Sequence, residues 1–313
     1  LKPKKPSYDP ASYRPISLTS CASKLFERMV NGRIRVYLEE NKILSEFQNG
    51  FRPNRSTADS IVHFIDDIQQ SFINKSYTYA IFIDLKNAFD KVNKAALQIK
   101  LHKVGLRGKL VSYIQNFLKD RTFNVRLGNT YSSSYTLDHG LPQGSVLSPT
   151  LFLIMINDLF ESFHPRLKHS MYADDVAIWY THSNSTVAYS NMQITLKDIQ
   201  TWCEKWGLTL SPTKTVAMYF PPKGSRNRES PPKFRINNLE LQYVTHFKYL
   251  GVVIDNKLNF NEHFKHITQK CARRINIIKC IAGKDWGADR STLLQLYISL
   301  IRPILDYNAF LFD

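Results

Sequence analysis

The sequence has no run of about 18 uncharged apolar residues, the length that a membrane-spanning helix requires. We therefore expect no membrane partner. The four cysteines, Cys21, Cys203, Cys271 and Cys280, show no CxxC spacing, which argues against both a zinc site and a disulfide framework. Because scattered cysteines are typical of reduced, buried thiols, we expect an intracellular protein.

Acidic residues are also scarce. The sequence has 26 Asp and Glu against 42 Lys and Arg, which gives a formal net charge of +16 and a pI near 9.6. A soluble basic protein would fit this composition. A polyanion partner would fit it too, because Lys and Arg displace condensed counterions from phosphate backbones. The aromatic content of 12% would add stacking surfaces for bases, although most of these rings belong to the core.

The length bounds the domain organisation. The 313 residues, 43% of them hydrophobic, exceed what one compact domain usually holds, so we expect two or three packed subdomains. The chain does not start with Met, its first residues are basic and proline-rich, and its last residues lie within an apolar pattern. We therefore expect a piece of a longer polypeptide.

Hydrophobic periodicity and turn residues predict the order of elements. Helices are expected over 19–40, with Ala22, Leu25, Phe26, Met29 and Val30 on one side, over 57–74 and 187–206, from a cap at Asn93 to Gly105, and from a cap at Ser148 onward. Strands are expected over 77–85, as a hairpin within 122–140, as two short strands within 169–180, and over 215–220 and 247–255. Residues 221–233 are expected to form an exposed loop, and the chain beyond 255 becomes helical and basic.

Two acidic segments stand out. Asp84 closes the apolar run YTYAIFID, and Asp174-Asp175 lie in a tight turn between apolar strands. Acids at the ends of buried strands are costly unless a metal ion or basic groups neutralise them. The plain alternative is a helix cap at Asp84 and ordinary turn formers at Asp174-Asp175.

The surrounding blocks favour the functional alternative. The chain resembles the reverse transcriptases of non-LTR (LINE-type) retrotransposons, particularly jockey-like elements of arthropods. The resemblance runs along essentially the whole chain through seven blocks in order: YRPISLTSCASKLFERM, QNGFRPNRSTADSI, AIFIDLKNAFDKV, GLPQGSVLSPTLF, YADD, GLTLSPTKT and FKYLGVVID. It implies an α+β right-hand polymerase with fingers, palm and thumb, and a small antiparallel palm sheet bearing the catalytic aspartates.

The resemblance also implies a metal site. Asp84, Asp174 and Asp175 match the catalytic aspartates, and the backbone carbonyl of Leu85 is a further expected ligand. Two Mg²⁺ ions are the implied cofactors, and Mg²⁺ prefers such oxygen ligands.

Five positions match nucleotide-binding residues of the family. The resemblance places Arg52 and Arg55 at the triphosphate, Phe89 under the sugar and Gln143 in the pocket, while Lys214 would neutralise or protonate the leaving pyrophosphate. A ring at Phe89 would clash with a 2′-hydroxyl and so select dNTPs. The alternatives are a core Phe, surface arginines and a solvated lysine. We expect the nearby Asp90 to be an ion-pair or helix-start acid.

Further positions resemble primer and template contacts. The hairpin that grips the primer end corresponds to Phe247, Lys248, Tyr249, Leu250 and Gly251. The basic segment that follows would belong to the thumb and would contact the nucleic-acid backbone through Lys265, Lys270, Arg273 and Arg274, with Ile267, Ile275 and Ile278 packing inward. The alternatives are an ordinary strand and a solvated charged face.

The implied division of the chain follows these blocks. Residues 1–76 would form the first part of the fingers, 77–105 the palm with the first catalytic Asp, and 106–140 a fingers–palm connection. Residues 141–255 would complete the palm with the YADD and primer-grip-like hairpins, and 256–313 would form a truncated thumb.

The implied partners are an RNA template, a DNA primer at a nicked chromosomal target, and dNTPs, in target-primed reverse transcription. The family pattern implies an upstream endonuclease in the parent polyprotein, leaves an RNase H open, and implies a nuclear location. The alternatives are a catalytically inactive nucleic-acid-binding remnant and an intron-maturase-type reverse transcriptase. An RNA-dependent RNA polymerase is disfavoured by Phe89 and by YADD in place of a Gly-Asp-Asp turn.

Overall fold

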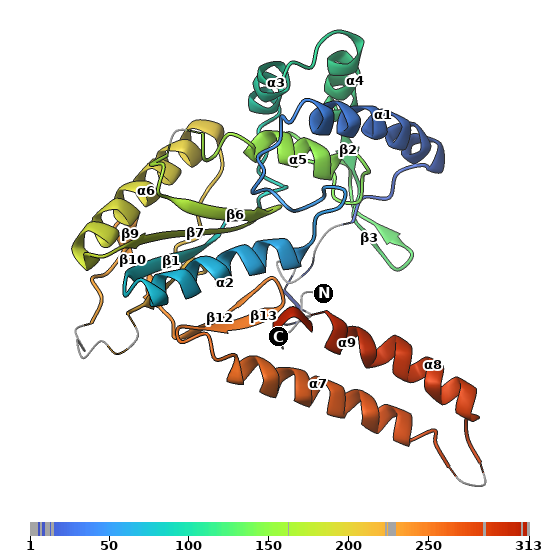
Figure 1. The fold of residues 1–313 in the computed structure, drawn as a ribbon. Helices are drawn as coiled ribbons and strands as arrows, with labels where there is room; N and C mark the ends of the chain where they lie inside the picture. The colour runs from blue at the N-terminus through green and yellow to red at the C-terminus, as the bar shows by residue number, and fades with distance from the viewer. Residues whose placement is uncertain are drawn as a thin grey trace.

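The structure is a computed structural model that describes residues 16–161, 163–222, 224, 230–283, 286–307 and 309–311, together with residues 6, 8, 9 and 13. Figure 1 shows a central sheet with helices on both faces, a helical group above it, and a helical pair extending below it. Of the predicted exposed loop 221–233, residues 223 and 225–229 lie outside the described residues. No helix in the described ranges is both long enough and apolar enough to cross a membrane.

The central sheet has the strand order β11-β8-β1-β7-β6. Its strands are β1 (Tyr77–Asp84), β6 (Lys168–Tyr172), β7 (Asp175–His182), β8 (Val216–Phe220) and β11 (Gln242–Tyr243). All neighbours pair antiparallel except β11, which runs parallel to β8. The register of β1 and β7 runs from Tyr77 opposite His182 to Asp84 opposite Asp175.

Both faces of the sheet are covered, so its central strands are apolar throughout rather than alternating. One face of β1, with Tyr79, Ile81 and Ile83, packs into the larger core beside α6 (Ser185–Trp206). The opposite face, with Ala80 and Phe82, packs on α2 (Thr57–Ile73) and on the separate hairpin of β12 (His246–Tyr249) and β13 (Val252–Asp255). Figure 1 shows α6 and α2 on opposite sides of the sheet.

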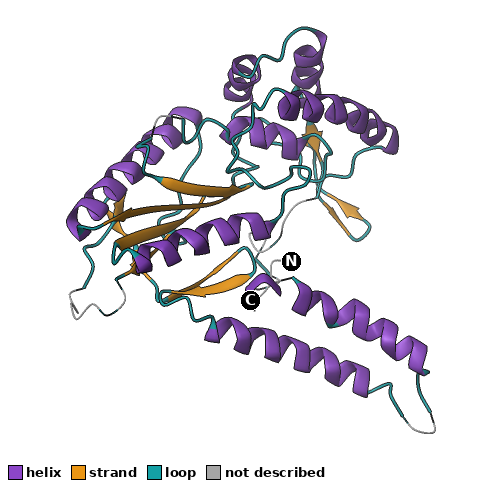
Figure 2. Cartoon of the chain, viewed as in Figure 1, coloured by secondary structure: helices purple, strands orange, loops and turns teal. Residues whose placement is uncertain are grey.

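Above the sheet lies a helical group (Figure 2). It contains α1 (Cys21–Glu40), α3 (Lys94–Lys103), α4 (Lys109–Leu118) and α5 (Ser148–Ile156), and beside them the two-stranded pairs β2 (Thr122–Phe123) with β5 (Tyr135–Thr136) and β3 (Arg126–Leu127) with β4 (Thr130–Tyr131). As predicted, Asn93 caps α3, because its side chain accepts from the Ala96 N–H.

One expectation for these helices was wrong. Ser148 is the first residue of α5 rather than its cap, because Leu147 already has helical dihedrals and the Ser148 hydroxyl donates to the Pro142 carbonyl. The apolar side of α1 is not buried at Leu25 (62% exposed) or Met29 (59% exposed), and the helix instead buries Ile34 and Leu38.

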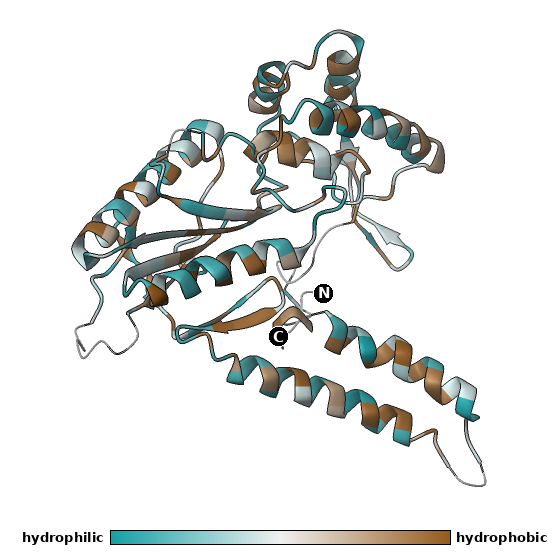
Figure 3. Ribbon diagram, in the orientation of Figure 1, coloured by the Kyte–Doolittle hydropathy of each residue, from teal (hydrophilic) through white to brown (hydrophobic). Residues whose placement is uncertain are grey.

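The C-terminal part leaves the sheet as α7 (Asn261–Lys279), α8 (Arg290–Leu300), α9 (Arg302–Asp306) and the 3-10 helix η2 (Ala309–Leu311), after the short pair β9 (Arg235–Ile236) and β10 (Leu239–Glu240). Figure 3 shows brown, apolar positions along α7 and α8. Ile267 is buried as predicted, but Ile275 is 40% exposed, because among the described elements α7 packs closely only on the neighbouring hairpin and the other C-terminal helices. The inward packing expected for Ile275 was therefore wrong.

Candidate active site

The three aspartates lie at one end of the two central strands. Asp84, the last residue of β1, is the register partner of Asp175, the first residue of β7. Asp174 precedes Asp175 in the turn from β6, where Tyr172 pairs with Asp175. Directly opposed residues of an antiparallel pair have Cα atoms about 4.5–5.5 Å apart and side chains on the same face. The fold thus brings together two acidic segments that are far apart in the sequence.

Asp84 lies beside Lys214. Its Oδ2 is 3.4 Å from the Lys214 Nζ, and the two side chains are 38% and 67% exposed. Such an exposed pair contributes less than about 1 kcal/mol, so another cation can replace the ammonium group. The Asp84 backbone is fixed, since its N–H donates to the Thr215 hydroxyl and its carbonyl accepts from the Ser211 N–H.

The backbone pairing of Leu85 sets the direction of its carbonyl. Leu85 forms an isolated antiparallel bridge with Leu210, flanked by bonds from the Lys86 N–H to the Thr209 carbonyl and from the Ser211 N–H to the Asp84 carbonyl. These flanking bonds make Leu85 and Leu210 a non-hydrogen-bonded pair, in which each residue's own carbonyl points away from its partner. The Leu85 carbonyl therefore points to the side of β7.

These groups are of the type that a divalent-cation site needs, because Mg²⁺ prefers oxygen ligands and needs only a few of them from rigid elements. Within the described ranges, no group of three acidic, histidine or cysteine side chains is arranged so that it could hold a metal ion. Neighbouring carboxylates repel one another unless cations neutralise them, which accounts for an open arrangement with Asp84 turned to Lys214. The role of these groups as metal ligands stays a prediction.

A hydrogen bond to the Gln48 side chain stabilises the turn that carries Asp174. Ala173 has a φ of 58°, in the left-handed region that L-residues rarely adopt. The Gln48 side chain is buried, and its Oε1 accepts from the Ala173 N–H at 3.0 Å and from the Gly50 N–H at 2.9 Å. A Cβ on Gly50 would lie 2.2 Å from the Ala173 nitrogen, so only glycine fits there. Sequence reasoning missed Gln48, because QNG indicated a loop but not what the loop contacts.

Gln143, which is predicted to line the nucleotide pocket, lies beside the segment that follows β1. The Gln143 Nε2 donates to Asp90 Oδ1 at 2.7 Å. The expectation that Asp90 stands at a helix start was wrong, because α3 begins only after the Asn93 cap. The ring of Phe89 is half-buried and stacks on Phe152 of α5 at 4.4 Å between centroids. Phe89 is thus both a core contact and partly open to solvent, and its role at the sugar stays a prediction.

The two arginines predicted to meet the triphosphate, Arg52 and Arg55, differ in their surroundings. Arg52 binds both carboxylate oxygens of Glu39, at 2.9 and 2.6 Å, and donates to the carbonyls of Ser45 and Gln48. The hydrogen bonds from the Arg52 guanidinium to the carboxylate lower the pKa of Glu39. The Arg52 side chain is only 8% exposed, so a triphosphate contact would first require a buried bidentate pair to break. Arg55 is exposed just before α2 and has no such pair among the described residues.

The primer-grip-like hairpin packs on the same sheet face as Asp84 and Asp175. Phe247 stacks on Phe82 at 4.6 Å, and Tyr249 is buried, which raises the pKa of its hydroxyl. At the hairpin turn, Leu250 and Gly251 have φ values of 44° and 92°. The Tyr307 hydroxyl, from the residue after α9, donates to the Leu250 carbonyl and lies 2.8 Å from the Thr57 hydroxyl of α2. Lys248 is exposed.

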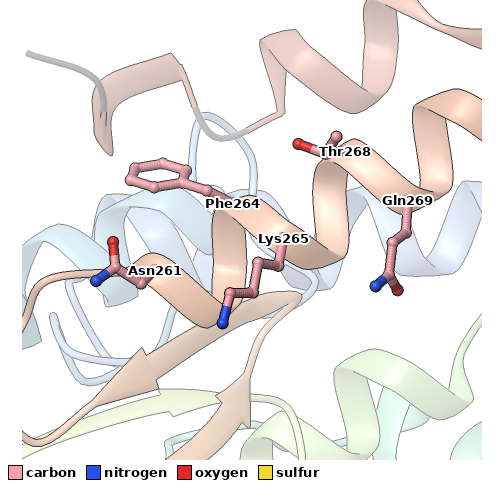
Figure 4. A pocket seen from close by; sticks show the side chains of 5 residues that line it. All are labelled: Asn261, Phe264, Lys265, Thr268 and Gln269. Carbon is pink, nitrogen blue, oxygen red and sulfur yellow. The ribbon is translucent and has the colours of Figure 1, made fainter.

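The basic residues predicted for the thumb lie on α7. A hollow of about 540 Å³ beside this helix is lined by Asn261, Phe264, Lys265, Thr268 and Gln269. Figure 4 shows that Lys265 and Gln269, one turn apart, point to the same side of α7. Lys265 pairs with Glu262 at 2.7 Å, whereas Lys270, Arg273 and Arg274 are exposed and form no ion pair within the described ranges. This part of the chain offers cationic groups to a polyanion, but its contacts stay a prediction.

Comparison with known proteins places these features in one family. Residues 2–254 match the family model described as reverse transcriptase (RNA-dependent DNA polymerase). The chain belongs to the reverse transcriptase family.

The relatives of this reverse transcriptase chain include polymerases of transposable elements. It is 33% identical over 313 residues to the probable RNA-directed DNA polymerase from transposon BS of Drosophila melanogaster. It is 28% identical over 306 residues to the RNA-directed DNA polymerase from mobile element jockey of the same species. These matches cover 98% and 96% of the chain but only 34% and 33% of the relatives, so it spans about a third of their length. The predicted resemblance to jockey-like elements is confirmed.

The solved structures that resemble this reverse transcriptase chain include telomerase of Candida tropicalis. The apo form, truncated from its C-terminal domain, gives a TM-score of 0.52 at 15% identity over 76% of this chain and 45% of that one. The same telomerase in complex with a fragment of telomeric RNA gives 0.50 at 13% identity over 93% of this chain and 47% of that one. At such low identity the likeness shows the fold alone, and it confirms the right-hand polymerase fold with mixed α+β structure. The residue limits of fingers, palm and thumb stay predictions.

Proposed function

We propose that the chain is an RNA-directed DNA polymerase that adds dNTPs to a DNA 3′ end on an RNA template. The observation that carries this proposal is the register of Asp84 with Asp175 beside the Asp174 turn. Membership of the reverse transcriptase family and the net charge of +16 support it. Because the chain spans only about a third of the length of these relatives, we assign it their polymerase activity as a proposal.

In this proposal Asp84, Asp174, Asp175 and the Leu85 carbonyl would hold two Mg²⁺ ions. When bound, a pair of divalent ions would activate the primer 3′-hydroxyl and neutralise charge on the α-phosphate and the leaving pyrophosphate. The chain supplies a rigid platform for them, since the two strands that carry the aspartates are paired along eight register positions. Gln48 fixes the turn between β6 and β7, which carries Asp174.

The remaining groups orient the nucleotide. Phe89 closes the space beside the sugar, and its stack on Phe152 keeps the ring from yielding to a 2′-hydroxyl. Gln143 lines the pocket from a loop that is tied to Asp90. Lys214, already at the first aspartate, neutralises the leaving pyrophosphate, and the exposed Arg55 is better placed than Arg52 to meet the triphosphate.

The biological setting in this proposal is target-primed reverse transcription of a non-LTR retrotransposon in the nucleus. The template is RNA, and the primer is the DNA end at a nicked target. The hairpin of β12 and β13 holds the primer end, and the exposed cations of α7 contact the nucleic-acid backbone. In this proposal the parent polyprotein carries an endonuclease, and the proposal leaves open an RNase H.

Primer extension tests the proposal. The purified chain is given a DNA-primed RNA template, dNTPs and Mg²⁺, and we expect extension that Asp174→Ala abolishes without weakening salt-sensitive binding of the primer–template. Asp120→Ala is the matched control, because that side chain is 83% exposed and far along the chain from the acidic turn. No extension by the wild type, or full extension by Asp174→Ala, would contradict the proposal. Binding without any extension would indicate a catalytically inactive remnant.

A further inference from the structure

A carboxylate side chain is fully buried in the helical group above the sheet. Glu27 of α1 is 0% exposed, and its carboxylate reaches across to the loop before α5. Its Oε2 accepts from the Ser145 hydroxyl at 2.6 Å, from the Val146 N–H at 2.8 Å and from the Leu147 N–H at 3.3 Å. Its Oε1 accepts from the Ser23 hydroxyl at 3.3 Å.

Such a carboxylate is costly unless its surroundings compensate for the lost water. Within the described part of the chain no cation forms an ion pair with Glu27, so the compensation comes from the donors of the loop. These donors lie just ahead of the first turn of α5, where the helix dipole also favours negative charge. A residue that served only to fill the core would be apolar here.

The loop that Glu27 holds is the one that carries Gln143. Gly144 has a φ of 99°, and the Gln143 carbonyl accepts from the Ser17 N–H at 2.7 Å. The Leu141 N–H in turn donates to the carbonyl of Phe89. The predicted pocket residue therefore lies between an anchor at Phe89 and the anchor at Glu27.

We infer that Glu27 is a positioning residue for nucleotide binding: it fixes the 141–147 loop so that Gln143 meets the incoming dNTP. This inference rests on the proposed function. Glu27 touches neither the aspartates nor the nucleotide, and it acts only through the loop and α5. Loosening the loop lowers the affinity for dNTP more than it lowers the rate of a bound complex, because the metal-holding strands are anchored elsewhere.

Steady-state extension by the full chain at varied dNTP concentration tests the inference. Glu27→Met removes the acceptor at similar length, and we expect the KM for dNTP to rise roughly tenfold with kcat lowered less than about threefold. Glu27→Gln keeps an oxygen for the loop donors and should restore most of the affinity. The Kd for the primer–template should not change. Tyr37→Phe is the matched control, since it removes one hydrogen bond of α1 to the Val104 carbonyl and leaves the loop untouched.

Several outcomes would overturn the inference. An inactive wild type defeats it together with the proposed function, whereas an active wild type with an unchanged KM in folded Glu27→Met defeats the inference alone. Equal losses in Glu27→Met and Tyr37→Phe would indicate general destabilisation. If Glu27→Met does not fold, Ser145→Ala decides, because it deletes one donor without adding bulk. A raised KM in Ser145→Ala supports the inference, and a wild-type KM overturns it.

Discussion

Replacing Gln48 by Met should damage catalysis far more than stability. Met has nearly the volume of Gln but no acceptor, so the buried N–H groups of Ala173 and Gly50 lose their partner. Each buried unsatisfied donor costs about 1–3 kcal/mol. The change also removes the Gln48 Nε2, a buried donor that has no partner among the described residues, and this offsets about one such loss. We therefore expect the free energy of unfolding to fall by about 2 kcal/mol.

The effect on activity should be larger, because the bond from the Ala173 N–H to Gln48 stabilises the φ of 58° at Ala173. If the turn relaxes, Asp174 moves, and a misplacement of about 1 Å can lower a rate roughly a hundredfold. Urea unfolding gives the stability, and primer extension at a temperature where both proteins are folded gives the rate. Gln70→Met, on the exposed side of α2, is the matched control. An extension rate within about twofold of the wild type in the folded variant would refute the reasoning.

Three further predictions concern other parts of the chain. Phe89→Ala should raise rNTP incorporation relative to dNTP roughly tenfold or more, and unchanged sugar selectivity would remove Phe89 from the pocket. Burial lowers the pKa of His169 to about 4, so that between pH 7 and pH 5 the unfolded chain binds a proton at this residue and the folded chain does not. The free energy of unfolding, measured with urea, should therefore fall by about 2 kcal/mol between pH 7 and pH 5. His169→Phe should remove that loss. Joint replacement of Lys270, Arg273 and Arg274 by Ala should lower the slope of log K against log salt by about 3 for primer–template binding, and an unchanged slope would contradict a phosphate-contacting role.

The sequence predicted those features that local patterns determine. The apolar run before Asp84 predicted a buried strand, and β1 runs from Tyr77 to Asp84. The tight turn within 169–180 and the hairpin within 122–140 were also confirmed. Periodicity could not give the register between β1 and β7, because pairing depends on which strand of the whole sheet comes next to β1.

The contacts that support the site could not be predicted, because they join residues far apart in the chain. The Glu27 bond to Ser145 spans 118 positions, and the Gln48 bond to Ala173 spans 125. Arg52 matched a family position, but only the structure shows that Glu39 holds its guanidinium group.

The apolar stripe of α1 illustrates a different limit. A stripe indicates which side of a helix is apolar, but not what covers that side. Here α5, apolar all round, occupies the interior, and α1 packs with Ile34 and Leu38 inward while Leu25 and Met29 remain exposed.

The most direct test of the central claim is a count of bound divalent ions. Electron paramagnetic resonance of Mn²⁺ can be recorded on the chain with a primer–template and a dNTP analogue that does not react. We predict two tightly bound ions in the wild type and loss of at least one in both Asp84→Asn and Asp174→Asn, with Asp120→Asn unchanged. Wild-type Mn²⁺ binding in the Asp84→Asn and Asp174→Asn variants would contradict the claim that these strand ends share the metal site.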